Sequence, residues 1–223
     1  MFRRYVVTND LPEILPIFPL SGALLLPRGT LPLNIFEPRY IQLVDDVMRG
    51  ERLIGMIQPR IPERLTATPP LYDIGCAGRI TSYTETEDAR FLITLTGLCR
   101  FRIMRELDAM TPYRQVEADF EPFANDLTAE DDDLLEEGVR ERLLNALKGY
   151  LTQQKMRADW ESIQHAPAEH LINALAMICP FETSEKQALL EAPTLPERAQ
   201  TLITLISMSG NEPSPGEDNG TLQ

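Results

Sequence analysis

The side chains most often used in catalysis are scarce in this sequence. Histidine occurs only as His165 and His170, five residues apart, whereas zinc ligands on one helical face are usually four apart with a glutamate base nearby. Because Pro167 lies between them, we interpret both as structural residues and not as metal ligands or acid–base groups. Ser184 and Lys186 are two residues apart at the start of an expected helix and point to different sides. Helix capping therefore explains Ser184 better than a serine–lysine dyad.

Nucleotide-binding and metal-binding patterns are also missing from the sequence. None of the three lysines follows a glycine, so there is no G-x-x-x-x-G-K-[ST] loop, and no G-x-G-x-x-G turn is found. Cys76, Cys99 and Cys179 are far apart and form no C-x-x-C pair, which predicts reduced core residues. A Ser–His–Asp triad can assemble in space without a sequence signature, so a weak hydrolase stays open as a third hypothesis. We expect no catalytic residues, no metal and no cofactor.

The charge balance narrows the classes of partner. The chain has 34 acidic and 21 basic residues, giving a net charge of −13. Nucleic-acid binders have a basic footprint, and anionic membranes repel acidic surfaces, so both partners are disfavoured. No run approaches the roughly 20 apolar residues of a membrane span. The N-terminal segment 1–10 has only three apolar residues after two arginines, against about 7–15 in a secretory signal, so we expect a cytoplasmic protein.

The first half of the sequence has the pattern of a β-rich unit. From Phe91 to Ile103 the odd positions are apolar and Gly97 fills the one gap, which predicts a long strand bent at the glycine. Shorter strands are expected at residues 15–20, 31–36, 53–57, 78–84 and 116–120. Prolines in the first two of these place them at sheet edges, strand ends or bulges. A helix is expected at residues 38–49, ended by Gly50.

The second half has helical spacing from about residue 126 to 208. Three apolar stripes are expected, on Val139, Leu143, Ala146 and Tyr150, on Leu171, Leu175 and Ile178, and on Leu195, Ala199, Leu202 and Ile206. Thr183 or Ser184 is expected to cap a further helix that runs to Leu190. The acidic run 130–133 has two interpretations, a cation or basic-partner site and the solvated start of a helix, where acids are favoured.

These patterns together predict an α+β protein in which the strands precede the helices. We divide the chain into an N-terminal arm (1–12), a β-rich unit (13–123), a helical unit (124–208) and a disordered tail (209–223) that is rich in small, polar and acidic residues.

Three ordered blocks resemble the N-terminal substrate-binding domain of the Lon protease family. They are L-P-I-F-P-L with L-P-R-G and L-P-L-N-I-F-E-P-R-Y (15–40), L-Y-D-I-G-C-A-G-R-I (71–80), and L-T-G-L-C-R-F-R-I (95–103). Segment 185–191 is similar to the helical part of the same domain, and the resemblance covers residues 13–208. It implies a PUA-like pseudo-β-barrel followed by an α-helical bundle. The family's ATPase module and serine–lysine peptidase domain have no counterpart in these residues, so the resemblance implies no enzyme.

The leading hypothesis is a non-catalytic module that binds unfolded polypeptides or a partner protein, adaptor-like in protein quality control. The expected contacts are Leu33, Ile35, Phe36 and Tyr40, flanked by Arg39, because a proline-bearing edge can accept an extended peptide by strand addition. In the alternative interpretation, Phe36 and Tyr40 only fasten the helix to the barrel.

Two further possibilities concern other partners. PUA-like barrels include RNA binders, so a small-molecule or RNA-binding module is the alternative function, although the net charge argues against RNA. A homo-oligomer is also open, because one of the apolar stripes of the helical half can form an interface between two copies of the chain.

Overall fold

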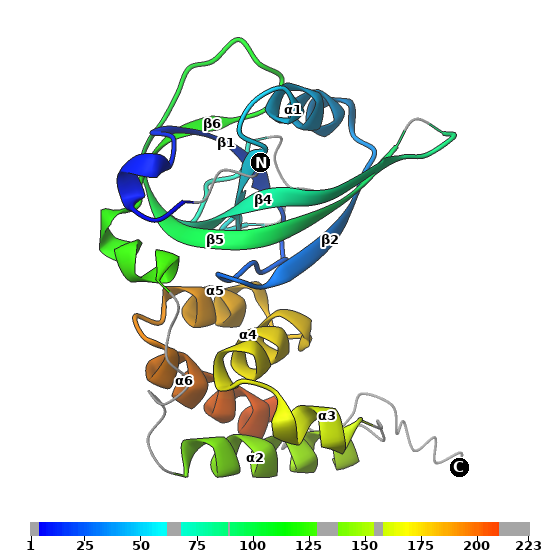
Figure 1. Ribbon diagram of the computed structural model, residues 1–223, viewed down its shortest axis with the longest axis vertical. Coiled ribbons are helices and arrows are strands. Elements are labelled where there is room, and N and C mark those ends of the chain that lie inside the picture. Colours follow the sequence, from blue (N-terminus) through cyan, green and yellow to red (C-terminus); the bar gives the residue numbers. More distant parts are fainter. Residues whose placement is uncertain (1–4, 62–67, 89, 129–137, 154–157, 210–223) are drawn as a thin grey trace, which may run out of the picture.

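A computed structural model describes residues 5–61, 68–88, 90–128, 138–153 and 158–209. The α+β class is confirmed, with the strands in the first half of the chain and most of the helices in the second (Figure 1). The elements are η1 (Thr8–Asp10), β1 (Ile14–Pro19), β2 (Thr30–Ile35), α1 (Pro38–Met48), β3 (Leu53–Ile57), β4 (Ile74–Glu85), β5 (Phe91–Glu106), β6 (Gln115–Asp119), η3 (Glu121–Leu127), α2 (Val139–Gln153), α3 (Trp160–His165), α4 (Ala168–Ile178), α5 (Thr183–Glu191) and α6 (Leu195–Ser209).

One mixed sheet contains all six strands in the order β2-β5-β4-β3-β1-β6. β5 also pairs with β6, and β1 pairs in parallel with β3 and antiparallel with β6. Figure 1 shows α1 above this sheet and α2 to α6 below it.

The proline-bearing strands agree only in part with the expected edge positions. β2, with Pro32, is the terminal strand of the order. β1 is not an edge strand, because it lies between β3 and β6. Its Pro16 instead lies where the pairing changes, since residues 14–16 face β6 and residues 17–19 face β3. A proline is tolerated there because the ladder on each side of β1 is short.

The bend expected at Gly97 is present as an irregularity in the β4–β5 pairing. Ala77 pairs with Cys99 and Gly78 with Gly97, so Leu98 is an extra residue in β5, as in a β-bulge. A Cβ atom on Gly97 would lie 2.0 Å from the carbonyl oxygen of Leu26. Only glycine fits where the β1–β2 connection crosses β5.

The helices follow the predicted pattern with several exceptions. In the expected α2 stripe, Ala146 is only half-buried and Leu147 is buried in its place, and the short helix α3 was not predicted. The α6 stripe is confirmed, because Leu195, Ala199, Leu202 and Ile206 are all buried. In α4, however, Ile178 is 79% exposed and Ile172 is buried, so the expected stripe was wrong at that residue. α5 is capped by Glu182 and not by Thr183 or Ser184.

Some expectations concern segments beyond the described ranges. The acidic run 130–133 and residues 210–223 of the expected tail lie outside the described residues. In the arm, Tyr5 and Leu11 are buried against the part of the core formed by β1 and β6.

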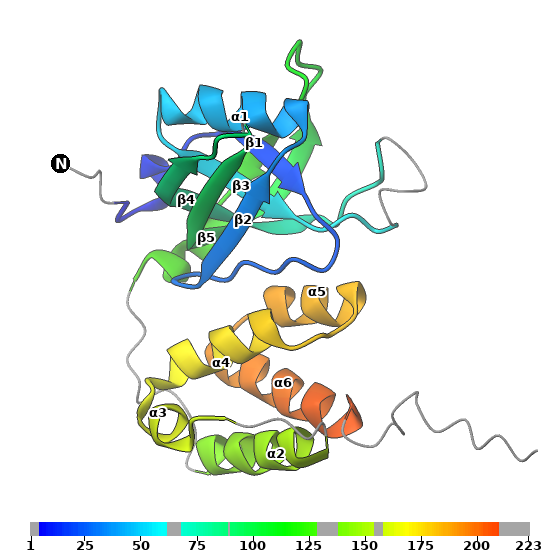
Figure 2. The same cartoon turned by 90° about the vertical axis from the view of Figure 1, so that its right-hand side faces the viewer.

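The two halves of the chain share one core. A single hydrophobic cluster includes Leu24, Leu25 and Leu26 of the β1–β2 connection together with Leu171 and Leu190 of the helical half. The β1–β2 connection therefore lies between sheet and helices, which positions the groove described next (Figure 2).

Candidate functional site

A groove of about 440 Å³ lies where α4 meets the start of β2. Its volume is in the range of small ligand pockets, and it is large enough for two bulky side chains. In Figure 2 these two elements face the viewer, with α4 below β2. The lining residues are Arg28, Gly29, Thr30, Pro167, Glu169, His170, Asn173, Ala174, Met177 and Ile178.

Two consecutive residues of the β1–β2 connection shape one wall of this groove. Arg28 has a left-handed backbone with φ of 63°, which costs energy for a residue with a side chain. At Gly29 a Cβ atom would lie 2.5 Å from the sulfur of Met177, so the backbone touches α4 directly. The groove is thus built on a strained, closely packed turn that leaves little freedom in its shape.

The charged groups of the groove already have partners within the protein. The Nε atom of Arg28 donates to both carboxylate oxygens of Glu169, at 2.8 and 2.7 Å, and its Nη1 donates to the carbonyl oxygen of Asp126 at 2.7 Å. The Asn173 amide donates to the Pro27 carbonyl oxygen at 3.1 Å. A ligand in the groove would find these polar groups already hydrogen-bonded.

Apolar atoms form the larger part of the accessible surface of the groove, beside the exposed polar residues Arg28, Thr30 and His170. Ile178 is 79% exposed, and Met177 and Ala174 lie beside it on α4. His170 and Thr30 supply polar rims, but the lining contains no serine or cysteine that could act with His170 as a nucleophile. The arrangement favours binding of apolar side chains over chemistry.

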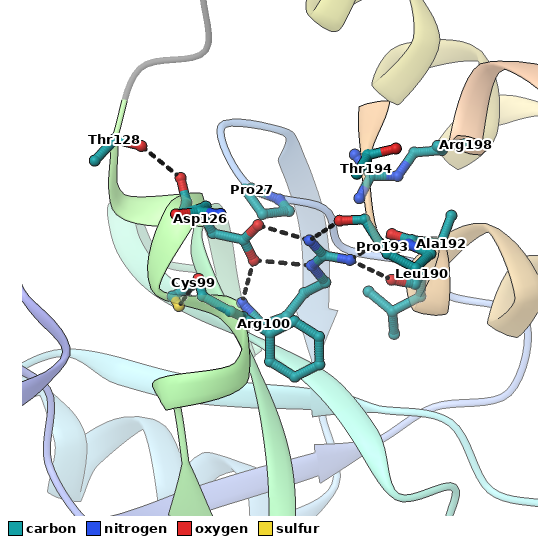
Figure 3. Close-up of polar contacts among 12 residues, drawn as sticks. Pro27, Cys99, Arg100, Asp126, Thr128, Leu190, Ala192, Pro193, Thr194 and Arg198 are labelled. Atoms are coloured by element: carbon teal, nitrogen blue, oxygen red, sulfur yellow. Dashed lines mark hydrogen bonds and ion pairs between the residues drawn. The ribbon is translucent and has the colours of Figure 1, made fainter. Parts of the chain in front are cut away.

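A buried ion pair links the β-rich half to the helical half near this groove. Arg100 and Asp126 are 4% and 6% exposed, and the Arg100 Nη2 atom lies 2.8 Å from Asp126 Oδ1. Arg100 Nη1 also donates to the carbonyl oxygens of Leu190, in the last turn of α5, and Ala192, just after it, at 3.2 and 2.6 Å (Figure 3). The ion pair and these bonds hold the helices at a fixed position relative to β5.

The residues expected from sequence at the binding surface divide into two groups. Ile35 and Tyr40 are 2% and 3% exposed and belong to the core. Phe36 is 60% exposed, whereas Leu33 and Arg39 are half-buried. Of the five contact residues expected from sequence, the structure therefore leaves only three accessible to a partner.

The catalytic candidates weighed from sequence lie on three different helices, His165 on α3, His170 on α4, and Ser184 and Lys186 on α5. His165 is exposed at the end of α3, where its Nδ1 lies 2.7 Å from the Glu161 carbonyl oxygen. Lys186 is buried, and its Nζ donates to the Gly22 carbonyl oxygen at 2.7 Å. Burial lowers the pKa of Lys186, and the amine serves to join α5 to the β1–β2 connection. Within the described ranges, no group of three acidic, histidine or cysteine side chains could hold a metal ion.

The three cysteines are free and buried, as the sequence indicated. Burial raises the pKa of Cys76 well above its usual value and that of Cys179 to about 11. Both thiols are therefore protonated and unreactive near neutral pH.

The sequence did not single out Arg28, Met177 or the exposure of Ile178. These residues come from segments about 150 positions apart, so no local spacing could bring them together. The one available signal is the dipeptide Arg28–Gly29 after Pro27, which is typical of a tight turn.

None of the helices in the described part of the chain is both long and apolar enough to cross a bilayer.

Comparisons with known proteins agree in sequence and in fold. The family model of the ATP-dependent protease La (LON) substrate-binding domain matches residues 14–208. Lon protease of Dictyoglomus thermophilum is 31% identical over 217 residues, covering 92% of this chain and 26% of that protein. Lon protease 2 of Myxococcus xanthus is 30% identical over 206 residues, covering 89% and 24%. The chain thus spans about a quarter of the length of these curated relatives.

Two solved structures share the fold. The Lon N-terminal domain protein from Xanthomonas campestris superposes with a TM-score of 0.59 at 23% identity, covering 86% of this chain and 97% of that one. The N-terminal domain of Mycobacterium avium complex Lon protease gives a TM-score of 0.61 at 16% identity, covering 87% and 98%. With the family model spanning nearly all of the described residues, the chain belongs to the Lon substrate-binding domain family.

Proposed function

We propose that this chain is a recognition module that binds unfolded or extended polypeptides without chemistry of its own, adaptor-like in protein quality control. The observation that carries the proposal is the groove between α4 and β2, whose accessible surface is more apolar than polar, in a domain whose family is described as substrate-binding. A cytoplasmic site of action fits three free, buried cysteines.

The chemistry of the groove favours apolar side chains over charged ones. Arg28, Glu169 and Asn173 are bonded within the protein, so a charged ligand group would have to compete with these bonds after losing its water. Met177 is flexible and polarisable, which suits contact with side chains of different shape. The groove can therefore select apolar segments with little dependence on exact sequence.

The surface expected from sequence stays part of the proposal. Phe36, Leu33 and Arg39 are accessible to a partner, whereas Ile35 and Tyr40 contribute from the core. The PUA-like pseudo-barrel is supported by the strand pairings, which run in a circuit from β5 through β4, β3, β1 and β6 back to β5. We also retain the division of the chain after residue 123.

The test is a titration of the protein with a labelled, unstructured polypeptide that carries leucine and phenylalanine clusters. A matched polypeptide with serine at those positions is the reference. We expect the apolar polypeptide to bind and Ile178→Asp to weaken binding about tenfold, because a carboxylate replaces exposed apolar surface that the bound polypeptide would cover. Fluorescence anisotropy measures the dissociation constant.

The matched control is Met110→Asp, which changes a fully exposed residue between β5 and β6, away from the groove. We expect this variant to bind as the unaltered protein does. The proposal fails if the folded protein binds neither polypeptide, or if both aspartate variants bind equally well.

A further inference from the structure

In the described part of the chain, the terminal strand of the sheet has one edge that no other strand occupies. β2 pairs with β5 alone and stands at one end of the strand order. It lies on the right-hand side of the sheet in Figure 1, the side that faces the viewer in Figure 2. An open edge of this kind is a template for another extended chain.

The register of β2 on β5 shows which backbone groups point outward. The Gly97 N–H donates to the Gly29 carbonyl oxygen at 2.9 Å, so this pair is a hydrogen-bonded one. Along an antiparallel ladder, hydrogen-bonded pairs alternate with non-hydrogen-bonded pairs. The backbone groups of Leu31 and Leu33 therefore bond to β5. Those of Thr30, Pro32 and Asn34 point away from it. Pro32 fits this alternation, because a residue whose backbone points away from β5 needs no N–H group to pair with that strand.

The outward edge therefore offers an uneven set of groups. It presents the carbonyl oxygens of Thr30, Pro32 and Asn34, but the N–H groups of Thr30 and Asn34 only. Within the described ranges, the outward backbone groups of these three residues form no backbone hydrogen bond with another segment. A chain that pairs here receives three acceptors and two donors.

This edge is continuous with the groove. Thr30, at the beginning of β2, is itself a lining residue of the groove. At the other end of β2, Phe36 and Leu92 are 60% and 46% exposed. Since a strand rises about 3.3 Å per residue, the path from Thr30 to Phe36 is about 20 Å long, the span of six extended residues.

We propose that the polypeptide partner binds by strand addition: an extended segment pairs its backbone with the free edge of β2 at residues 30–34 and places an apolar side chain in the α4 groove. This inference rests on the proposed function and assigns its binding mode. Because Pro32 has no N–H, the N–H groups of the partner contribute more to binding than its carbonyl groups do.

The first test uses a labelled peptide of alternating leucine and threonine residues with a lysine at each end. Two derivatives carry N-methyl groups on all leucines or on all threonines. In an added strand only alternate N–H groups face β2, so one derivative binds and the other loses affinity about tenfold or more. Equal affinity of both derivatives overturns strand addition, while binding of the parent peptide leaves the proposed function standing.

The second test changes the edge itself. Asn34→Pro removes one outward N–H and leaves the bonds to β5 intact, whereas the control Asn34→Ala keeps the backbone donor. We expect Asn34→Pro to bind the parent peptide about threefold to tenfold more weakly than Asn34→Ala, and Pro32→Ala to bind it more tightly by a similar factor.

Circular dichroism confirms that each variant is folded, and Ile178→Asp serves as the reference for the groove. If Asn34→Pro and Asn34→Ala bind alike while Ile178→Asp is impaired, the edge has no part in recognition and the inference is overturned. If Asn34→Pro instead abolishes a dimer detected by sedimentation and leaves peptide binding unchanged, the edge serves a second copy of the chain, which also overturns it.

Discussion

Arg100 forms hydrogen bonds with four residues from two other segments of the chain. Its backbone N–H and side chain bind Asp126, and its guanidinium group also reaches carbonyl oxygens at residues 190, 192 and 193. The ring of Phe123 lies 4.8 Å below the guanidinium carbon. A planar group with several donors suits such a junction, and a lysine could not reproduce it.

Asp126→Asn is expected to lower the free energy of unfolding by about 3 kcal/mol, because it leaves the buried Arg100 charge without its counter-ion. Asp73→Asn is the matched control, since the Asp73 side chain is 75% exposed in its pair with Arg60. We expect that change to cost less than about 1 kcal/mol. Urea denaturation measures both, and similar losses would contradict the structural role of Arg100.

Single residues show where sequence reasoning succeeds and where it stops. The burial of Leu202 and Ile206 follows from helical spacing alone. In α4, apolar residues occupy nearly the whole circumference, so spacing could not tell Ile172, which is buried, from Ile178, which is exposed. Which side faces the core depends on the β1–β2 connection, and that contact is not encoded locally.

The long strand β5 organises the elements of the β-rich half. It pairs with β2, β4 and β6, and its irregularity at Gly97 lets the β1–β2 connection pass close to it. The alternation of apolar residues predicted this strand and its glycine. Strand order was beyond prediction, because the β1–β6 pairing joins distant segments.

Two glycine substitutions are expected to have opposite effects on stability. Gly97→Ala should lower the free energy of unfolding by about 3 kcal/mol, because the new methyl group meets backbone that has no room to move. Gly149→Ala in α2 should raise it by about 0.5–1 kcal/mol, since nothing lies within 4 Å and alanine favours a helix. Urea denaturation of both variants checks the pair, and a neutral Gly97→Ala would contradict the close crossing.

The whole molecule is held together by a core that both halves share. Leu24, Leu25 and Leu26 are at most 2% exposed because helices cover them from below. The groove at this junction combines residues 28–30 with residues 167–178, which explains why the sequence pointed to binding and to the right family but not to this site.

The shared core predicts that sheet and helices unfold together. Trp160, the sole tryptophan, reports on the helical half, and hydrogen exchange of the β4 and β5 amides reports on the sheet. We expect both probes to give the same denaturation midpoint. Asp126→Asn should shift them equally. Earlier loss of the tryptophan signal would show that the helices are an independent unit and would contradict the shared core.

The pairing of β1 with β6 also affects how the chain is made. Ile14 pairs with Glu117, so about a hundred residues must be synthesised before β1 meets that neighbour. During translation Leu15 and Ile17, both fully covered in the finished protein, leave the ribosome long before their cover exists. We propose that this protein binds unfolded apolar polypeptides, and early in its own synthesis it is itself such a polypeptide. We expect it to need a chaperone at that stage.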